Sequence, residues 1–198
     1  MARTPAPGTR KRILDTASRL FGTHGVRAVG MQQMMDESGM GKSLLYREFP
    51  SKDDLVTAWL KATDEEWWAQ AEEAIAVHEG DPARQLLALV EFVRDGALIA
   101  EFHGCVFYNT SAEFRDPGHP GRQEAVSHLS RIRLRLVDLG LAAGARPDAA
   151  EELADALMLV IGGLLANSAA LGPDGPTRLA IPTARAIIDQ YCPVARVG

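Results

Sequence analysis

The chain has 198 residues, of which 46% are hydrophobic, and a formal net charge of -5 at pH 7. This length can bury a good core as one compact unit or as two small ones. Its two cysteines, Cys105 and Cys192, argue against a disulfide-built secreted domain, and the N-terminus lacks the apolar segment of an export signal. These features favour a cytoplasmic protein.

A first helix is expected after a short N-terminal arm. Residues 1–9 are predicted to be a disordered basic arm. The helix that follows is expected from about Arg10 to Thr23, with Thr9 as its cap. Its apolar residues repeat at the spacing of one helix face and predict a buried stripe: Ile13, Ala17, Leu20 and Phe21.

Residues 31–49 indicate two short helices joined by a glycine turn. Four residues at positions i, i+3, i+4 and i+7 give the first helix a buried face: Met31, Met34, Met35 and Ser38. Gly39 is expected to end it, because glycine tolerates the left-handed conformation with which a chain leaves a helix. A second helix then starts at about Lys42 and turns Leu45 and Phe49 inward.

The outward face of that second helix is mostly polar and suits the major groove of DNA. Lysine and arginine can meet phosphates or guanine edges, and tyrosine offers a hydroxyl and a ring. The candidate DNA-binding residues, including one from each neighbouring helix, are Gln32, Lys42, Ser43, Leu44, Tyr46, Arg47 and Lys52. Two helices joined by a glycine turn also occur in all-helical cores that never touch nucleic acid, so the turn alone leaves both interpretations open.

A long helix is expected next. Ser51 and Asp54 have the capping-box spacing at its start, and it continues to about Val77, which makes it roughly 40 Å long at 1.5 Å per residue. Trp59, near its start, is expected to pack on the two short helices. In its first turn, the Lys52 ammonium and the helix N-terminus could both meet a phosphate, and a solvated lysine is the alternative.

One pattern runs through all of these segments. Its residues are Arg12-Ile13-Leu14-Asp15-Thr16-Ala17, Leu20-Phe21, Gly25, Gly39, Lys42, Leu45-Tyr46, Phe49-Pro50-Ser51-Lys52 and Leu55. Over about residues 10 to 56 it resembles the N-terminal domain of the tetracycline-repressor (TetR) family. The resemblance implies a three-helix DNA-binding domain with the helix-turn-helix as helices two and three. It also implies a larger helical domain that dimerises and binds a small molecule.

The chain departs from the family pattern at three places. Val29-Gly30 stand where the family commonly has Ser or Thr capping the second helix. Gly41 stands where a hydroxyl residue often opens the recognition helix, and Leu44 holds a position often occupied by Thr. Each change removes a DNA contact that the resemblance would otherwise imply.

The charge is divided unevenly between the two expected domains. Residues 10–55 are assigned to the helix-turn-helix domain and residues 56–198 to a regulatory and dimerisation domain. Residues 1–55 carry nine basic and six acidic residues, so the remainder carries a net charge of -8. The excess of +3 places the electrostatic footprint for DNA at the N-terminal end.

Aromatic residues gather in the C-terminal part, after a helix that Asp81-Pro82 is expected to start with a cap and an N1 proline. They can form the apolar wall of a small-molecule pocket, with a histidine and an asparagine to orient the ligand. The candidate ligand-binding residues are Trp67, Phe92, Phe102, His103, Phe107, Tyr108 and Asn109. Plain core packing explains the aromatic residues about as well.

Neither catalysis nor metal binding is expected. His103 and Cys105 lie two residues apart, but the chain has neither C-x-x-C nor H-E-x-x-H spacing. Nothing marks a base or an orienting group for a cysteine nucleophile. We therefore predict no catalytic residue, no metal ligand and no cofactor.

The strongest signal for self-association lies in a helix expected to be capped by Asp148. A helix that is apolar all round must be covered all round. No polar face is left across the middle of this one by its apolar residues, which are Leu153, Leu157, Met158, Val160, Ile161, Leu164 and Leu165. With a last helix in which Pro182 favours a kink or a delayed start, it predicts a four-helix dimer interface. The candidate interface residues are Leu157, Ile161, Leu164, Leu165, Ile187 and Tyr191. The central helix of a monomeric core is the alternative.

The expected fold is all-α, with about nine helices and no membrane span. The expected function is a homodimeric, ligand-responsive regulator, most simply a repressor that releases a palindromic operator on binding a small molecule. A constitutive DNA-binding protein and a small-molecule-binding helical protein are the alternatives. They differ in whether duplex binding depends on salt and whether a small molecule reverses it.

Overall fold

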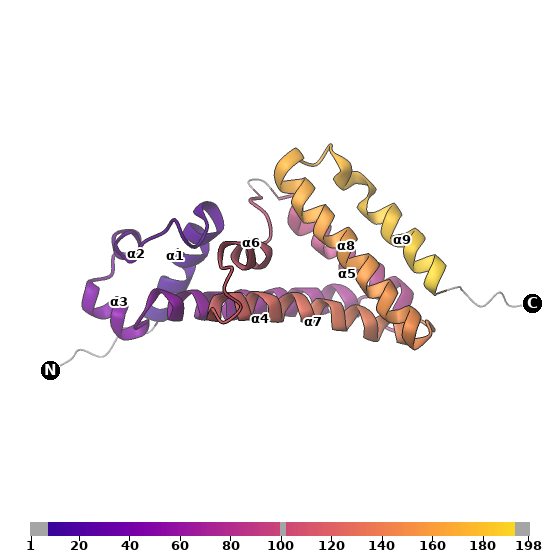
Figure 1. Cartoon of the computed structure of the whole chain (residues 1–198), viewed down its shortest axis with the longest axis horizontal. Coiled ribbons are helices and arrows are strands. Elements are labelled where there is room, and N and C mark those ends of the chain that lie inside the picture. The colour runs from indigo at the N-terminus through magenta and orange to yellow at the C-terminus, as the bar shows by residue number, and fades with distance from the viewer. Residues whose placement is uncertain (1–7, 100–101, 193–198) are drawn as a thin grey trace, which may run out of the picture. The chain divides into compact units, whose positions relative to one another are not determined.

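The computed structural model describes residues 8–99 and 102–192, and this part of the chain is all-α (Figure 1). The predicted arm, apart from its last two residues, lies outside the described residues. The elements are α1 (Thr9–His24), α2 (Met31–Ser38), α3 (Lys42–Glu48), α4 (Lys52–Ala76), α5 (Pro82–Ala97), α6 (Val106–Glu113), α7 (Pro120–Ala142), α8 (Pro147–Leu171), the 3-10 helix η1 (Pro176–Leu179) and α9 (Ala180–Tyr191). The predicted fold class is confirmed.

At two of the predicted helix starts, the expected capping hydrogen bonds are present. The Ser51 N–H donates to the Asp54 carboxylate at 3.0 Å, and the Asp54 N–H donates to the Ser51 hydroxyl at 3.1 Å, which is the reciprocal capping box. At the start of α5, the Asp81 carboxylate accepts the Arg84 N–H at 3.0 Å. Local side-chain chemistry therefore fixes where α4 and α5 begin.

Two other predicted helix starts were wrong. The residue before α1 is Gly8, and Thr9 is buried inside the helix instead of capping it. At α8, Pro147 takes the first helical position and Asp148 pairs with Arg146, so Asp148 is not the cap. Helix α9 begins at Ala180, and Pro182 lies in its first turn, where a missing N–H costs nothing.

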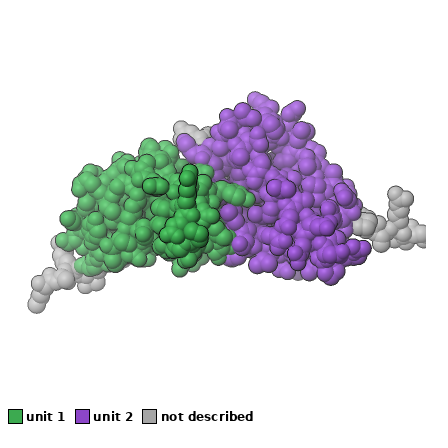
Figure 2. All heavy atoms as spheres, in the orientation of Figure 1, with its two compact units in different colours: residues 1–65, 106–128 green, residues 66–105, 129–198 purple. Residues whose placement is uncertain are grey.

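The chain divides into two compact units, coloured separately in Figure 2. Unit 1 comprises Met1–Glu65 and Val106–His128, and unit 2 comprises Glu66–Cys105 and Leu129–Gly198. The predicted division at residue 55 falls inside α4, and unit 1 also takes in α6 and the start of α7. The segment around α6, assigned from the sequence to the regulatory part, therefore packs with the predicted DNA-binding helices.

Unit 1 is built around the apolar stripe of α1. Ile13, Ala17, Leu20 and Phe21 are all buried, as the periodicity predicts. Trp59 of α4 meets Phe21 edge to face, with ring centroids 5.1 Å apart. This contact places the start of α4 against α1, and packing of Trp59 on the two short helices stays a prediction.

Unit 2 packs α8 and α9 against α5, which run side by side in Figure 1. Its core is aliphatic, with Leu86, Leu89, Leu153 and Leu157 fully buried. By length and composition alone, α8 is apolar enough to cross a membrane. Core helices of soluble proteins have the same property, and α8 supplies much of the core of unit 2.

Candidate nucleic-acid interface

The turn between α2 and α3 has the geometry that the glycines predict. Gly39 follows α2 with φ of 67°, in the left-handed region that a glycine adopts without strain. Met40, next in the chain, is buried, and its N–H donates a hydrogen bond to the Met35 carbonyl at 3.2 Å. The chain thus leaves one helix and enters the next within three residues.

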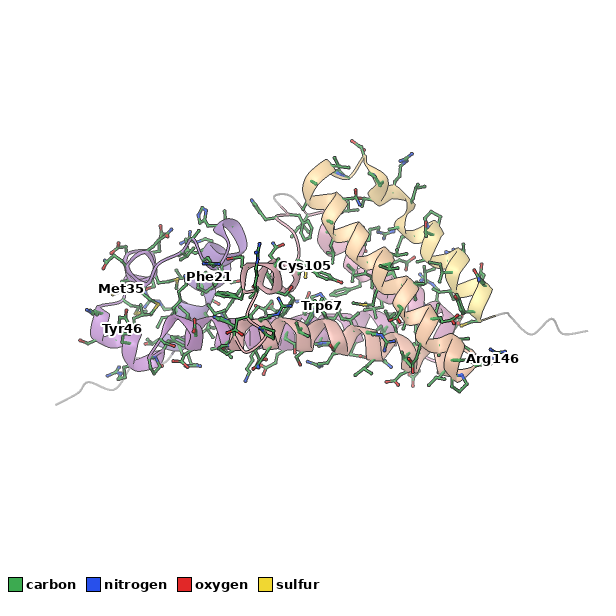
Figure 3. All side chains as sticks on the ribbon, in the orientation of Figure 1. Phe21, Met35, Tyr46, Trp67, Cys105 and Arg146 are labelled. Atoms are coloured by element: carbon green, nitrogen blue, oxygen red, sulfur yellow. The ribbon has the colours of Figure 1, made fainter. Side chains whose placement is uncertain are left out.

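Helix α3 separates its side chains into an inner and an outer face. Leu45, together with Phe49 just after the helix, is buried among the helices of unit 1. Lys42, Ser43 and Arg47 are exposed, Tyr46 is 38% exposed, and Leu44 is half-buried (Figure 3 labels Tyr46). Arg47 lies 4.0 Å from the Glu48 carboxylate, which is a long contact. An exposed basic and aromatic face on a short helix is suited to base edges and phosphates.

The first turns of α1 hold the C-terminal ends of both helices of the motif. Arg10 donates to the last carbonyl of α3, that of Glu48, at 3.0 Å, and its guanidinium lies 4.3 Å from the centroid of the Phe49 ring. Arg12 makes a longer contact, 3.5 Å, with the last carbonyl of α2, that of Ser38. Cations at these ends complement the helix dipoles. Neither contact could be predicted from the sequence pattern.

Two predicted DNA contacts come from the flanking helices. Gln32 is exposed on α2, where its amide donates to the Asp36 carboxylate at 2.9 Å. Lys52 is half-buried, and its ammonium donates to the Arg27 carbonyl at 3.5 Å. Burial lowers the pKa of Lys52, and the nearby carboxylates of Glu113 and Asp53 oppose that shift. The ammonium has three N–H donors, so two remain for a phosphate while the third meets the Arg27 carbonyl.

Neither helix of the motif has a side chain capping its start. Gly30 precedes α2 and Gly41 precedes α3, and neither position supplies a side-chain hydrogen bond. The departures from the family pattern at Gly30 and Gly41 therefore leave both helix starts without a side-chain cap. Contacts to DNA at these places depend on backbone N–H groups.

The predicted ligand-binding residues fall into both units. Trp67 and Phe92 of unit 2 meet edge to face, with centroids 5.3 Å apart. Phe102 and His103 belong to the same unit, where Phe102 is half-buried and His103 is exposed. Phe107, Tyr108 and Asn109 belong to α6 in unit 1. Phe107 is buried and stacked on His128 at 3.6 Å between ring centroids, so its ring already serves core packing. A ligand-binding role for the set stays a prediction.

Three of the predicted dimer residues are almost fully buried in the single chain. Leu157, Ile161 and Leu164 are at most 3% exposed, because they fill the core between α8 and its neighbours in the same chain. Their part in a dimer interface stays a prediction. Leu165, Ile187 and Tyr191 are half-buried at the edge of that core and remain candidates.

In the part of the chain that the structure describes, no three side chains of His, Cys, Asp or Glu gather closely enough to hold a metal ion. The fold and the outer face of α3 instead define a protein with a helix-turn-helix of the DNA-binding type.

Comparison with known proteins places this motif in a family. Residues 13–59 match the family model described as bacterial regulatory proteins, tetR family. The HTH-type transcriptional regulator YxaF of Bacillus subtilis is 48% identical over 49 residues, which are 24% of this chain and 26% of YxaF. The HTH-type transcriptional activator FasR of Mycolicibacterium smegmatis is 37% identical over 59 residues, 30% of this chain and 27% of FasR. The chain thus spans about a quarter of the length of these curated relatives.

The likeness of the fold extends over the whole chain. The crystal structure of a TetR-family transcriptional regulator from Streptomyces coelicolor has a TM-score of 0.87 and 26% sequence identity, covering 93% of this chain and 96% of that one. The chain therefore resembles TetR-family transcriptional regulators in its fold, and the residues that match the family model include α2 and α3, the two helices of the motif.

Proposed function

We propose that the protein is a homodimeric, ligand-responsive transcriptional repressor that releases a palindromic operator when it binds a small molecule. The observation that carries the proposal is the exposed face of α3, where Lys42, Tyr46 and Arg47 lie opposite the buried Leu45. Those three residues, with Ser43 and Leu44, would enter the major groove. The protein would act in the cytoplasm, and catalysis forms no part of the proposal.

A homodimer is proposed because one short helix reads too little DNA. Two recognition helices about 34 Å apart meet successive major grooves on one face of the duplex. The proposed interface is the outer stripe of α8, where Leu159 is 79% exposed and Gly163, Ala166 and Ala170 follow at helical spacing. Beside it, a groove of about 160 Å³ between α8, η1 and α9 is lined by apolar residues that include Leu159 and Leu179. Small residues let a partner helix approach closely.

A ligand response would pass through the elements that have residues in both units. Helix α4 carries Lys52–Glu65 in unit 1 and its remaining residues in unit 2, and α7 is divided in the same way. A small molecule that prefers one arrangement of these helices shifts the equilibrium by its differential affinity for the two states. Only a few kcal/mol are needed for a response of about 100-fold.

The test uses compounds that bind the protein, whatever their identity. A library is screened for molecules that raise the melting temperature of the protein. Each of these molecules is then added to a complex with a duplex that the protein has selected from random sequence. We expect the strongest binders to weaken duplex affinity by at least tenfold, because linkage between the two sites is reciprocal.

The alternatives give different results in the same experiment. A constitutive DNA-binding protein keeps its duplex affinity when the stabilising compounds are bound. A helical protein that binds only small molecules selects no duplex and shows no salt-dependent binding. FasR is named as an activator, so a compound that strengthens duplex binding would favour activation over repression for this chain.

A further inference from the structure

Helix α6 ends at a carboxylate that is inserted into the DNA-binding domain. Glu113, the last residue of α6, accepts the Val26 N–H through Oε1 at 3.1 Å and the Arg27 N–H through Oε2 at 2.7 Å. Arg27 returns a hydrogen bond from its guanidinium to the Glu113 carbonyl at 3.3 Å. All of these residues belong to unit 1. One side chain therefore binds two successive backbone donors of the turn that follows α1.

The turn is shaped to receive an anion. Gly25 ends α1 with φ of 80°, and a Cβ atom at this position would lie 2.9 Å from Oε1 of Glu113. Glycine thus supplies both the left-handed backbone and the space for the carboxylate. Successive N–H groups after such a residue form a concave anion-binding site, which is known as a nest. Here the anion comes from the protein itself.

The same turn determines where α2 begins. Arg27 is followed by Ala28, the buried Val29 and Gly30, which immediately precedes α2. Because only these three residues separate the anchored Arg27 from α2, a displacement of the turn displaces the start of α2. Helix α2 is held in the core of unit 1 by the buried Met34, and only the three residues 39–41 join it to α3.

Two contacts from α4 converge on the same region of unit 1. The Lys52 ammonium reaches the Arg27 carbonyl, so Arg27 is held at its N–H by α6 and at its carbonyl by α4. Next to Lys52, Asp53 pairs with His119 at 3.4 Å, and His119 stacks on Phe114, the residue after Glu113. The turn is therefore fixed from α6 and α4 together.

We propose that Glu113 is a positioning residue for DNA recognition, which holds the turn between α1 and α2, and through it the helix-turn-helix, in the DNA-binding arrangement. The proposal rests on the DNA-binding role of the family domain and not on the ligand response. It predicts a change in affinity for the selected duplex that is opposite in sign to the change expected from charge alone. Removal of a negative charge from a DNA-binding unit strengthens duplex binding by Coulomb attraction alone, whereas loss of a positioning contact weakens binding to the selected sequence.

The experiment compares Glu113→Ala and Glu113→Gln with Glu65→Ala, which removes an exposed carboxylate of the same unit. The full-length proteins are titrated at several salt concentrations into a duplex selected from random sequence by the parent and into a scrambled duplex. We expect Glu113→Ala to lose about tenfold in affinity for the selected duplex, as for a lost pair of hydrogen bonds to a charged group. The scrambled duplex should bind to Glu113→Ala and to Glu65→Ala at least as tightly as to the parent, because both variants lose a negative charge, and Glu65→Ala should not lose affinity for the selected duplex.

Glu113→Gln keeps the test valid if the alanine variant does not fold. Its amide oxygen accepts one of the two N–H groups, so an intermediate loss of sequence preference is expected together with a parent-like helical content. The proposal is overturned if both Glu113 variants bind the selected duplex as tightly as, or more tightly than, Glu65→Ala. Absence of salt-dependent binding by the parent would instead refute the DNA-binding role itself.

Discussion

Replacing both Lys42 and Tyr46 by alanine should lower affinity for the selected duplex by about 100-fold or more, while the protein keeps its fold and its oligomeric state. Each good contact to a base edge contributes about 1–3 kcal/mol, and a dimer loses every contact twice. Neither side chain supports the core, since both lie on the outer face of α3. Fluorescence anisotropy with a labelled duplex measures the affinity, and circular dichroism checks the fold.

The matched control for this double variant is Lys61→Ala. Lys61 is another exposed lysine of unit 1, and it pairs with Glu124 at 3.3 Å on a different part of the unit. If Lys42 meets a phosphate, its loss from both subunits reduces the salt slope by about 1.8, at about 0.9 per contact. A double variant that binds like Lys61→Ala would show that the outer face of α3 does not read DNA.

The substitution Leu159→Asp should convert the protein into a monomer and abolish tight binding to the palindromic duplex. Leu159 is 79% exposed in the single chain and lies at the centre of the proposed interface. An aspartate there would be buried near its own copy, and an unpaired buried charge costs several kcal/mol. Because a monomer engages only one half-site, affinity for the duplex should fall by about 100-fold or more. Sedimentation equilibrium measures the mass.

Leu134→Asp provides the control, because Leu134 is also an exposed leucine of unit 2, at 57%, but on α7. This variant should remain a dimer and bind the duplex like the parent. If Leu134→Asp dissociates and Leu159→Asp does not, the interface lies on α7 and not on α8.

The local features of the fold could be predicted because neighbouring residues determine them. The inward side chains of α3, Leu45 and Phe49, follow from a four-residue spacing, and the Gly39 turn follows from the conformational freedom of glycine. The capping box at Ser51 and Asp54 needs only residues three apart. These features supplied the recognition face, which is the centre of the candidate site.

Which residues of α8 meet a partner could not be predicted, because hydrophobic periodicity does not identify the buried face of a helix that is apolar on every side. In α8, Leu157 and Leu159 are both leucines two residues apart, yet the first is fully buried and the second is largely exposed. Which face points inward is decided by packing against α5 and α9, and those contacts are distant in sequence. The apolar run predicts that the helix is covered, without indicating which residues meet the partner.

The contact of Glu113 with the turn after α1 was missed for a related reason. The carboxylate and the Arg27 N–H are separated by 86 residues. Because every residue except proline has a backbone N–H, the sequence does not mark which of these donors binds a side chain. Gly25 was recognised as part of the family pattern, but the pattern does not reveal that the missing Cβ makes room for a carboxylate. The contacts of Arg10 and Arg12 with helix ends could not be predicted for the same reason, since they join residues 38 and 26 positions apart.

Hydroxyl-radical footprinting of the parent protein on its selected duplex tests the central claim most directly. A dimer that places two copies of α3 in successive major grooves should protect two stretches, about 34 Å apart, on one face of the duplex. Both stretches should disappear together when Lys42 and Tyr46 are replaced by alanine. A single protected stretch, or protection that persists in the double variant, would contradict the proposal that a homodimer reads DNA through α3.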